Sequence, residues 1–322
     1  VSVKELRETV ATLLEHNPMK EVLDLMHNKI GVDGACSLRR VLEVDGTLTT
    51  LNLADNGIEN DGACAIGRAL EANELLTTLS LGWNGIYDDG ISGFARALEV
   101  NKTLTSLNLQ DNFIGPDGAH AIGRALEVNG TLATLYLNGN EIGDHGAGSI
   151  CRALEVNGAL RTLHLERTAI GAAGASGIGR ALEINQALTT LKVGGNGICA
   201  DGAGKIGRAL EVNGVLKTLD LAGNRVGNDG ASAIGQALEV NKALTILHLN
   251  GNRVGNDGAS AIGRALEVNG TLTALYLNSN QVGDAAGSAF CKALEVNNTM
   301  RTLRLGNIGQ SMQKDIDTAL ES

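Results

Sequence analysis

The chain has 322 residues, with 43% hydrophobic residues, only 2% aromatic residues and a net charge of −10. A negative balance of this size argues against nucleic-acid binding, which needs clustered Lys and Arg to neutralise phosphates. No apolar run reaches the roughly 18 residues of a membrane span, so we expect no membrane insertion. The five cysteines form no Cys-x-x-Cys pair. Their odd number favours reduced thiols and a cytoplasmic location.

The N-terminal residues 3–16 have the spacing of an amphipathic helix. The sequence LEHN at 14–17 stands one repeat period before LEVD at 42–45. We therefore predict that residues 1–18 form the helix of an incomplete first unit, which covers the end of the core as a terminal cap does.

A motif, Leu-x-x-Leu-x-Leu-x-x-Asn, then recurs every 28 residues and predicts about 11 units over residues 19–305. In the most regular copy, 216–241, alternation predicts a strand with Leu219 and Leu221 inward and Thr218 and Asp220 outward. The Asn ends each strand motif, and we expect its amide to satisfy backbone groups of adjacent turns. Its positions are 28, 56, 84, 112, 140, 196, 224, 252 and 280, with Thr168 in place of one Asn.

A helix follows each strand, as GASAIGQALEV illustrates, with Ile234 and Leu238 spaced to face the core. An Asp precedes the helix in most units, and we predict that it is the N-cap. A small residue recurs in the middle of the helix, where it should let neighbouring helices pack closely, and the final Asn-Gly favours a left-handed C-terminal turn. The Asp positions are 61, 89, 117, 201, 229 and 257, and the helix glycines are 67, 123, 179, 207, 235 and 263.

The last unit lacks two residues in its turn, and residues 306–322 read as a C-terminal capping helix with a polar face. Strands lie about 4.8 Å apart, whereas packed helices need about 8–10 Å. A stack of such units must bend with its strands inside. The sequence thus predicts one domain over 1–322, a right-handed α/β solenoid shaped as a horseshoe, with a concave parallel sheet and convex helices.

The repeat LxxLxLxxNxIGxDGAxAIGxALExN resembles the ribonuclease-inhibitor-like class of leucine-rich repeats over nearly the whole chain. The constant 28-residue length is most similar to the leucine-rich repeats of NOD-like receptors. The class also includes ribonuclease inhibitor, which alternates two repeat lengths, and Ran GTPase-activating protein, which has an acidic tail. The resemblance implies the fold and a role in protein binding, but it transfers no functional residue to a matching position.

Catalytic and metal chemistry finds little support in the sequence. The segment 168–179 is similar to a dinucleotide-binding glycine loop, but Gly177 and Gly179 align with the helix of other units, where no phosphate can reach a helix N-terminus. The six histidines have no metal-ligand spacing. We therefore expect no catalytic residue, no cofactor and no metal.

Comparison of equivalent positions among units locates the candidate binding surface. The outward strand positions vary while the framework does not. A partner-binding face or drift on an unconstrained surface would both produce this variation. The candidates on this face are Asn108, Tyr136, His164, Lys192, Asp220, His248, Tyr276 and Arg304, followed in the next outward position by Gln110, Asn138 and Glu166.

Three aromatic residues strengthen the binding interpretation. Trp83, Tyr87 and Phe113 occupy turn positions that hold Gly, Asp, Glu or Arg in other units, so we expect them to be exposed and close together. The alternative is that they cap their turns locally. A second candidate surrounds His164, Glu166 and Arg167, where Thr168 interrupts the Asn series.

The sequence therefore favours a non-catalytic, monomeric module that binds a protein partner through the concave sheet and the adjoining turns. Two alternatives stay open. The chain is a regulator of an enzyme, such as an inhibitor or a GTPase-activating scaffold, or it is the sensor region of a larger protein of the NOD-like receptor type.

Overall fold

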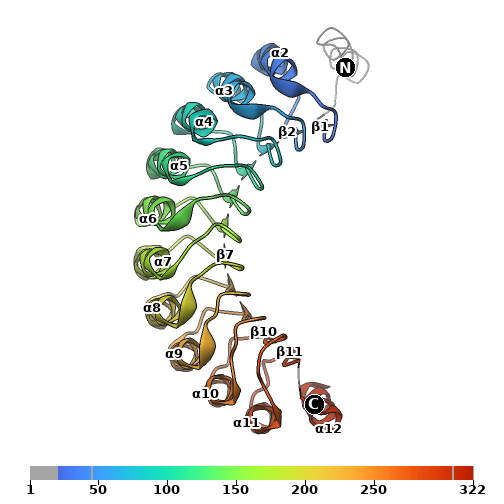
Figure 1. Cartoon of the computed structure of the whole chain (residues 1–322), viewed down its shortest axis with the longest axis vertical. Coiled ribbons are helices and arrows are strands. Elements are labelled where there is room, and N and C mark those ends of the chain that lie inside the picture. The colour runs from blue at the N-terminus through green and yellow to red at the C-terminus, as the bar shows by residue number, and fades with distance from the viewer. Residues whose placement is uncertain (1–20, 45, 307, 322) are drawn as a thin grey trace. The chain divides into compact units, whose positions relative to one another are not determined.

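The computed structural model describes residues 21–44, 46–306 and 308–321. They form two compact units that divide between His164 and Leu165, here called unit 1 and unit 2. In both units each repeat contributes one short strand and one helix (Figure 1). The predicted class, an α/β leucine-rich-repeat solenoid, is confirmed. The helix predicted within residues 1–18 lies outside the described residues.

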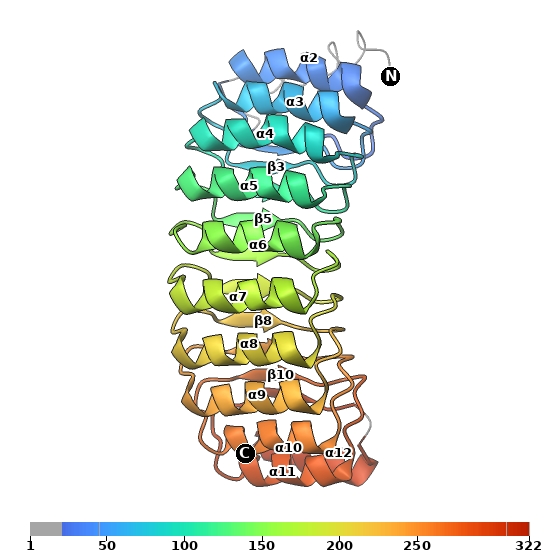
Figure 2. The ribbon, with the colours of Figure 1, turned by 60° about the vertical axis from the view of Figure 1, so that its left-hand side comes forward.

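Within the described residues, unit 1 contains six parallel strands in chain order, with the helices of successive repeats side by side (Figure 2). Its strands are β1 (Val22–Asp24), β2 (Thr50–Asn52), β3 (Thr78–Ser80), β4 (Ser106–Asn108), β5 (Thr134–Tyr136) and β6 (Thr162–His164). Its helices are α2 (Gly31–Val44), α3 (Glu59–Leu70), α4 (Asp88–Val100), α5 (Pro116–Val128) and α6 (Gly143–Leu154).

Unit 2 repeats the arrangement with five strands and six helices within the described residues. Its strands are β7 (Thr190–Lys192), β8 (Thr218–Asp220), β9 (Ile246–His248), β10 (Ala274–Tyr276) and β11 (Thr302–Arg304). Its helices are α7 (Ala172–Ile184), α8 (Cys199–Val212), α9 (Gly227–Val240), α10 (Asn256–Leu266), α11 (Asp284–Leu294) and α12 (Gln310–Glu321). The segment 168–179 runs from a turn into α7, so its last glycines are helical as the repeat register predicts.

The core lies between the sheet and the helices of each unit. Equivalent leucines of successive repeats pair in register, as Leu51 with Leu79 and Leu219 with Leu247. Leu219 and Leu221 are fully buried and Asp220 is half-buried, as the alternation predicts. Ile234 and Leu238 of α9 are also fully buried. Because aromatic residues are rare, aliphatic side chains supply most of the buried area.

Glycines in the helices permit their close stacking, as predicted. A Cβ atom added at Gly123 would lie 2.9 Å from the Ser149 carbonyl oxygen of the next helix. At Gly207 it would lie 3.1 Å from the Ala233 oxygen. Backbone atoms cannot withdraw as a flexible side chain can, so the repeat requires Gly here despite its low helix propensity.

The predicted Asn ladder is present in both units. The Asn84 amide nitrogen donates to the carbonyl oxygens of Leu53 (2.9 Å) and Gly82 (3.1 Å), and its oxygen accepts from the nitrogens of Asn56 (3.0 Å) and Ile58 (3.3 Å). Each such side chain thus ties two repeats together through groups that are otherwise buried without partners. Thr168 substitutes in part: its hydroxyl donates to the Leu165 oxygen over 2.7 Å, but a hydroxyl has one donor where an amide has two.

A second Asn ladder follows the helices, and it overturns the predicted left-handed turn. Asn101, after α4, has φ −67° and ψ 132°, which is extended. Its nitrogen donates to the oxygens of Leu70 (2.8 Å) and Asn73 (3.0 Å), and its own oxygen accepts from the backbone nitrogen of Leu104 (2.8 Å). The Asn is required for this side-chain bridge between repeats and not for a positive φ. The equivalent buried residues are Asn73, Asn129, Asn157, Asn185, Asn213, Asn241 and Asn269.

The predicted Asp N-caps are also wrong. The helices begin before these residues, so Asp61, Asp89, Asp117, Asp201, Asp229 and Asp257 lie within the first turn. The N-cap residues make no side-chain capping bond within their own helix. A side chain already inside the helix cannot cap it, but its negative charge still suits the positive end of the helix dipole.

The turn before each helix has two forms, selected by a residue one repeat earlier. Where that residue is Asn or Asp, its side-chain oxygen accepts from the N-cap nitrogen and the N-cap is extended. Asn60 thus holds Tyr87 (2.8 Å), and Asn228 holds Gly255 (2.7 Å). Where that upstream residue is neither Asn nor Asp, the residue in the same column as Tyr87 and Gly255 has a left-handed backbone. Glu59, Gly143, Cys199 and Gly227 are of this form, and the residues one repeat before them are Val32, Pro116, Ala172 and Ala200, respectively.

The C-terminal end keeps the same bond despite its shortened turn. Asp284 accepts from the Gly309 nitrogen over 2.8 Å, across 25 residues where other repeats span 27. The difference matches the two missing residues. Helix α12 then follows within the segment 306–322 that was predicted to be helical.

Candidate functional site

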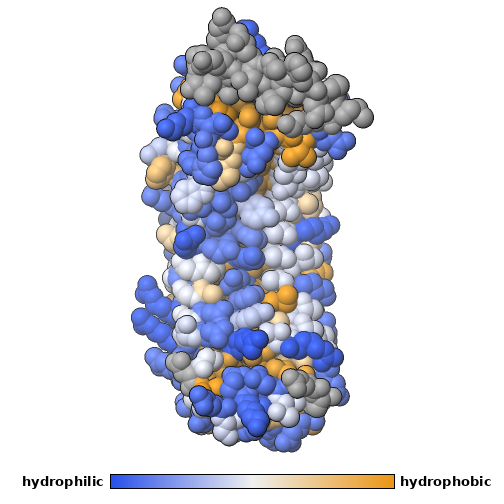
Figure 3. All heavy atoms as spheres, turned by 90° about the vertical axis from the view of Figure 1, so that its right-hand side faces the viewer, coloured by the Kyte–Doolittle hydropathy of each residue, from blue (hydrophilic) through white to orange (hydrophobic). Residues whose placement is uncertain are grey.

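In unit 1 the predicted strand-face candidates lie side by side. Asn108 of β4 is in register with Tyr136 of β5, and Tyr136 with His164 of β6. The Tyr136 and His164 rings meet edge to face, with centroids 4.6 Å apart and planes at 73°. The face is mainly hydrophilic to neutral in hydropathy (Figure 3). Away from the apolar atoms at the N-terminal end of Figure 3, it therefore presents mainly polar and aromatic groups.

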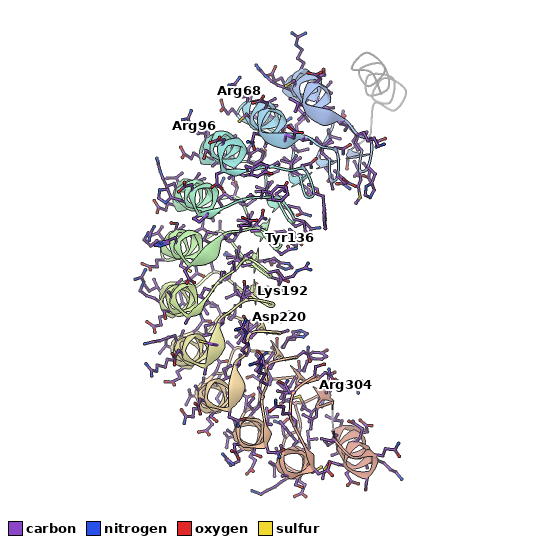
Figure 4. All side chains as sticks on the ribbon, in the orientation of Figure 1. Arg68, Arg96, Tyr136, Lys192, Asp220 and Arg304 are labelled. Carbon is purple, nitrogen blue, oxygen red and sulfur yellow. The ribbon has the colours of Figure 1, made fainter. Side chains whose placement is uncertain are left out.

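The strand face of unit 2 carries the charged candidates. Lys192 pairs in register with Asp220, Asp220 with His248, and Tyr276 with Arg304. The His248 and Tyr276 rings stack in parallel at 4.4 Å. Figure 4 shows Lys192, Asp220 and Arg304 on the strand side of this unit, and Tyr136 on the strand side of unit 1. The unit 2 residues form one continuous row across β7–β11, as predicted.

The next outward position of the repeat, which holds Gln110, Asn138 and Glu166, is held more firmly by hydrogen bonds than its sequence variation suggests. Asn108 accepts the Gln110 backbone nitrogen over 2.9 Å, so one strand-face side chain fixes the turn that carries another. Asn138 is half-buried and its carbonyl oxygen accepts from the Asp111 nitrogen over 2.8 Å. Some residues at this outward position thus take part in the hydrogen bonds that stabilise the turn.

Glu166 is a half-buried carboxyl group on the same side of unit 2. Burial raises its pKa above the ordinary value of 4.5, an effect that the nearby Asp220 reinforces and that Lys192 and Arg167 oppose. The Glu166 backbone also lowers the pKa by hydrogen bonding. Desolvation is the largest of these effects, so ionised Glu166 is costly in the folded state.

We expect Glu166→Gln to stabilise the chain at neutral pH. A raised carboxyl pKa means that the unfolded state releases its proton first, so stability falls as pH rises from about 4.5 through the folded pKa. Because Gln does not ionise, the stability of the Glu166→Gln variant should not show this decrease. Urea unfolding between pH 4 and 8 measures it, with the exposed Glu211→Gln as the control. Identical pH profiles for the wild type and Glu166→Gln would contradict the assignment.

The turn aromatics are exposed, and two of them are in contact. Trp83, Tyr87 and Phe113 have exposed fractions of 54%, 52% and 48%. The Tyr87 and Phe113 rings stack with centroids 4.8 Å apart and an interplanar angle of 17°. Among the described residues, Trp83 makes no ring contact with this pair. The predicted exposure is observed for all three residues and the predicted proximity for two.

Asn60 sets the geometry of this pair, and the sequence analysis did not find it. Its bond to the Tyr87 nitrogen keeps Tyr87 extended, with φ −102° and ψ −177°. The extended turn pairs with the next one, since the Phe113 nitrogen donates to the Ile86 oxygen over 2.9 Å. That pairing places the two rings together. The available signal was an Asn or Asp one repeat upstream of the N-cap.

We expect Asn60→Ala to separate the two rings. Without its acceptor, the Tyr87 turn should adopt the left-handed form that follows Val32 or Pro116. Nuclear Overhauser contacts between the Tyr87 and Phe113 rings should disappear, and the free energy of unfolding should fall by about 0.5–1.5 kcal/mol.

Asn228→Ala is the matched control, because Asn228 makes the same bond to Gly255 where no aromatic pair is present. It should cost similar stability and leave the ring contacts intact. Ring contacts that survive in Asn60→Ala would show that Asn60 does not position the pair.

The second predicted candidate is less well defined. Arg167 is exposed with φ 53°, and its nitrogen donates to the Gly194 oxygen over 2.9 Å. The neighbouring Thr168 is fully buried. His164 belongs to unit 1, whereas Glu166 and Arg167 belong to unit 2.

Two further structural properties bear on function. No helix within the described residues is long and apolar enough to cross a membrane. In that same part of the chain, no group of three or more His, Cys, Asp and Glu residues is placed to hold a metal ion.

The repeated strand–turn–helix unit and its Asn ladder define a leucine-rich-repeat protein. The family described as "Leucine Rich repeat" matches eight segments that together span more than half of the sequence, and the chain belongs to this family. The segments are 16–38, 47–67, 72–95, 100–123, 128–151, 212–235, 240–263 and 268–291.

Two solved structures illustrate the similarity. "Leiomodin-1 Actin-Binding Site 2 (ABS2)" is 28% identical over 48% of this chain and 88% of its own length, with a TM-score of 0.41. The tropomodulin C-terminal domain of Caenorhabditis elegans is 19% identical over 47% and 92%, with the same TM-score of 0.41. No curated protein matches the chain in sequence.

Proposed function

We propose that the chain is a non-catalytic protein-recognition module. Its partner contacts the strand face and the turns that follow the strands, including Trp83, Tyr87 and Phe113. The observation that carries this proposal is the exposure of three of the seven aromatic residues on one group of turns. Large aromatic side chains that stay in water are frequent anchors of protein interfaces. The short hydrogen-bonded turns hold them in place before binding, which lowers the entropic cost of association.

The proposal extends to subtype and compartment. The constant 28-residue repeat supports the NOD-like-receptor type of ribonuclease-inhibitor-like repeat. Among the described residues, Cys36, Cys64, Cys151, Cys199 and Cys291 form no disulfide bond, which supports the reducing environment of the cytoplasm. We also propose that the module acts as a monomer.

A quantitative pull-down tests the proposal. The double variant Trp83→Ala/Phe113→Ala should recover less than a tenth of the partner recovered by wild type. The double variant Val212→Ala/Val240→Ala alters two side chains that are 66% and 56% exposed on helices, and it should recover partner normally. Equal recovery by wild type and the aromatic variant would reject the turn surface as the binding site.

A further inference from the structure

Tyr87, one member of the stacked aromatic pair, borders a hollow with an acidic lining. The hollow has a volume of about 530 Å³ and is lined by Val32, Glu59, Asn60, Asp61, Gly85 and Tyr87. Both carboxylates are exposed, and Asn60 is the residue that holds Tyr87 in place. We call this hollow, together with Phe113, the acidic aromatic pocket. An aromatic side chain, two carboxylates and an open space are therefore brought together in unit 1.

Two of the bulky residues in this region occupy positions that favour glycine. Glu59 has φ 55°, at the position that holds Gly31, Gly143 and Gly227 in other repeats. Trp83 has φ 60°, in a column that is left-handed both at Gly139 and at non-glycine residues such as Asp55 and Asp111. The left-handed conformation costs an L-residue about 1–2 kcal/mol. The positive φ is a property of the turn, and because Gly satisfies it at both positions, neither side chain is needed to build the repeat.

The charge around the pocket differs from that of the equivalent turns in unit 2. Asp61 lies in a framework column that recurs as Asp201, Asp229 and Asp257. Two of the turn columns before it carry charges of either sign. Asp55 and Asp111 share one column with Arg167, and Glu141 shares another with Lys29, Arg225 and Arg253, whereas Glu59 is the single charged residue of its column. The fold thus accepts either sign, and unit 1 combines the negative sign with aromatic rings.

From this complementarity we infer that the acidic aromatic pocket receives a lysine or arginine side chain from a basic segment of a partner protein. The cation lies near the Tyr87 ring, where its attraction to the aromatic face adds to its pairing with Glu59 and Asp61. This inference rests on the proposed function and specifies the chemistry of the partner.

The Tyr87–Phe113 stack and the acidic rim make separable contributions. An acidic partner or a phosphorylated segment is repelled by the rim. A purely apolar segment gains from the rings but leaves Glu59 and Asp61 without counter-charges. A basic segment gains from both the rings and the carboxylates, so removal of either should weaken its binding.

Binding of a fluorescein-labelled octa-arginine peptide to the full chain tests the inference. At physiological salt, Glu59→Gln and Tyr87→Leu should each weaken binding about tenfold. Glu211→Gln removes the same charge from an exposed position on α8 and should change binding less than twofold. Trp83 is the single tryptophan of the chain, so its fluorescence reports occupancy of the neighbouring turns independently. Thermal unfolding followed by circular dichroism verifies that each variant is folded.

Three outcomes would overturn the inference. An equal loss in Glu59→Gln and Glu211→Gln would mean that octa-arginine responds only to net charge. An unchanged affinity in Tyr87→Leu would remove the rings from the site. Equal affinity for octa-glutamate would exclude cation recognition. If partner recovery still depends on Trp83 and Phe113 while octa-arginine binding does not depend on Glu59 or Tyr87, the recognition module stands and the basic segment is rejected.

Discussion

Asn252→Ala should lower the free energy of unfolding by about 3 kcal/mol or more, because several backbone groups lose buried partners. The Asn252 side chain is fully buried. It donates to the oxygens of Leu221 (2.8 Å) and Asn250 (3.3 Å), and it accepts from the nitrogens of Asn224 (2.8 Å) and Val226 (3.2 Å). Alanine leaves these groups without that side chain, and each buried group that stays unpaired costs about 1–3 kcal/mol.

Urea unfolding followed by circular dichroism measures this loss, and Asn28→Ala is its matched control. Asn28 has the same place in the repeat but is exposed at the start of the described array, where its amide donates to the Met26 oxygen over 3.0 Å. Water can replace that bond, so we expect a change below about 1 kcal/mol. Equal losses in the two variants would mean that the ladder contributes nothing beyond a surface hydrogen bond.

Gly123→Ala should destabilise the chain although alanine is the better helix former. The new Cβ atom would lie 2.9 Å from the Ser149 oxygen and 3.1 Å from the Ser149 carbonyl carbon. Helices α5 and α6 must then separate, and overpacking of this kind costs about 1–3 kcal/mol. This cost exceeds the gain of up to about 1 kcal/mol from helix propensity.

Gly148→Ala in α6 is the matched control, and it should leave the stability of the chain unchanged or raise it. No atom lies within 4 Å of a Cβ placed at Gly148, so only the gain in propensity remains. Differential scanning calorimetry should show a lower melting temperature for Gly123→Ala and an unchanged or higher one for Gly148→Ala. A stabilised Gly123→Ala would show that the helices are not packed to the limit that the distances indicate.

Most of the fold can be predicted from the period of the repeat. Because the motif returns at a constant interval without drift, the strands, the core leucines, the first Asn ladder and the helix glycines follow from one aligned copy. The Asp N-caps and the left-handed helix ends were wrong for a common reason. Both rested on rules about sequence neighbours, whereas Asn101 bonds to Leu70 and Asn73, and Asn60 to Tyr87, one repeat away.

The candidate surface was predictable in composition but not in geometry. Comparison among repeats identified Tyr87 and Phe113 as departures from the turn columns, and both are exposed. Their stacking depends on Asn60, a residue that looks like an ordinary polar position on a helix. The hollow beside Tyr87 depends on Glu59, whose left-handed backbone cannot be read from its identity.

The dependence of each turn on the preceding repeat limits how such a chain can evolve or be engineered. A single-repeat cassette cut out and inserted elsewhere keeps its own residues but inherits the turn geometry dictated by its new upstream neighbour. Tyr87 placed after a repeat with the Ala172 or Ala200 type of residue would lose its extended turn and its alignment with the next ring. The shape of the turn surface is therefore determined by two consecutive repeats. In a shuffled array, each turn should be kept together with the upstream Asn or Asp that fixes its conformation.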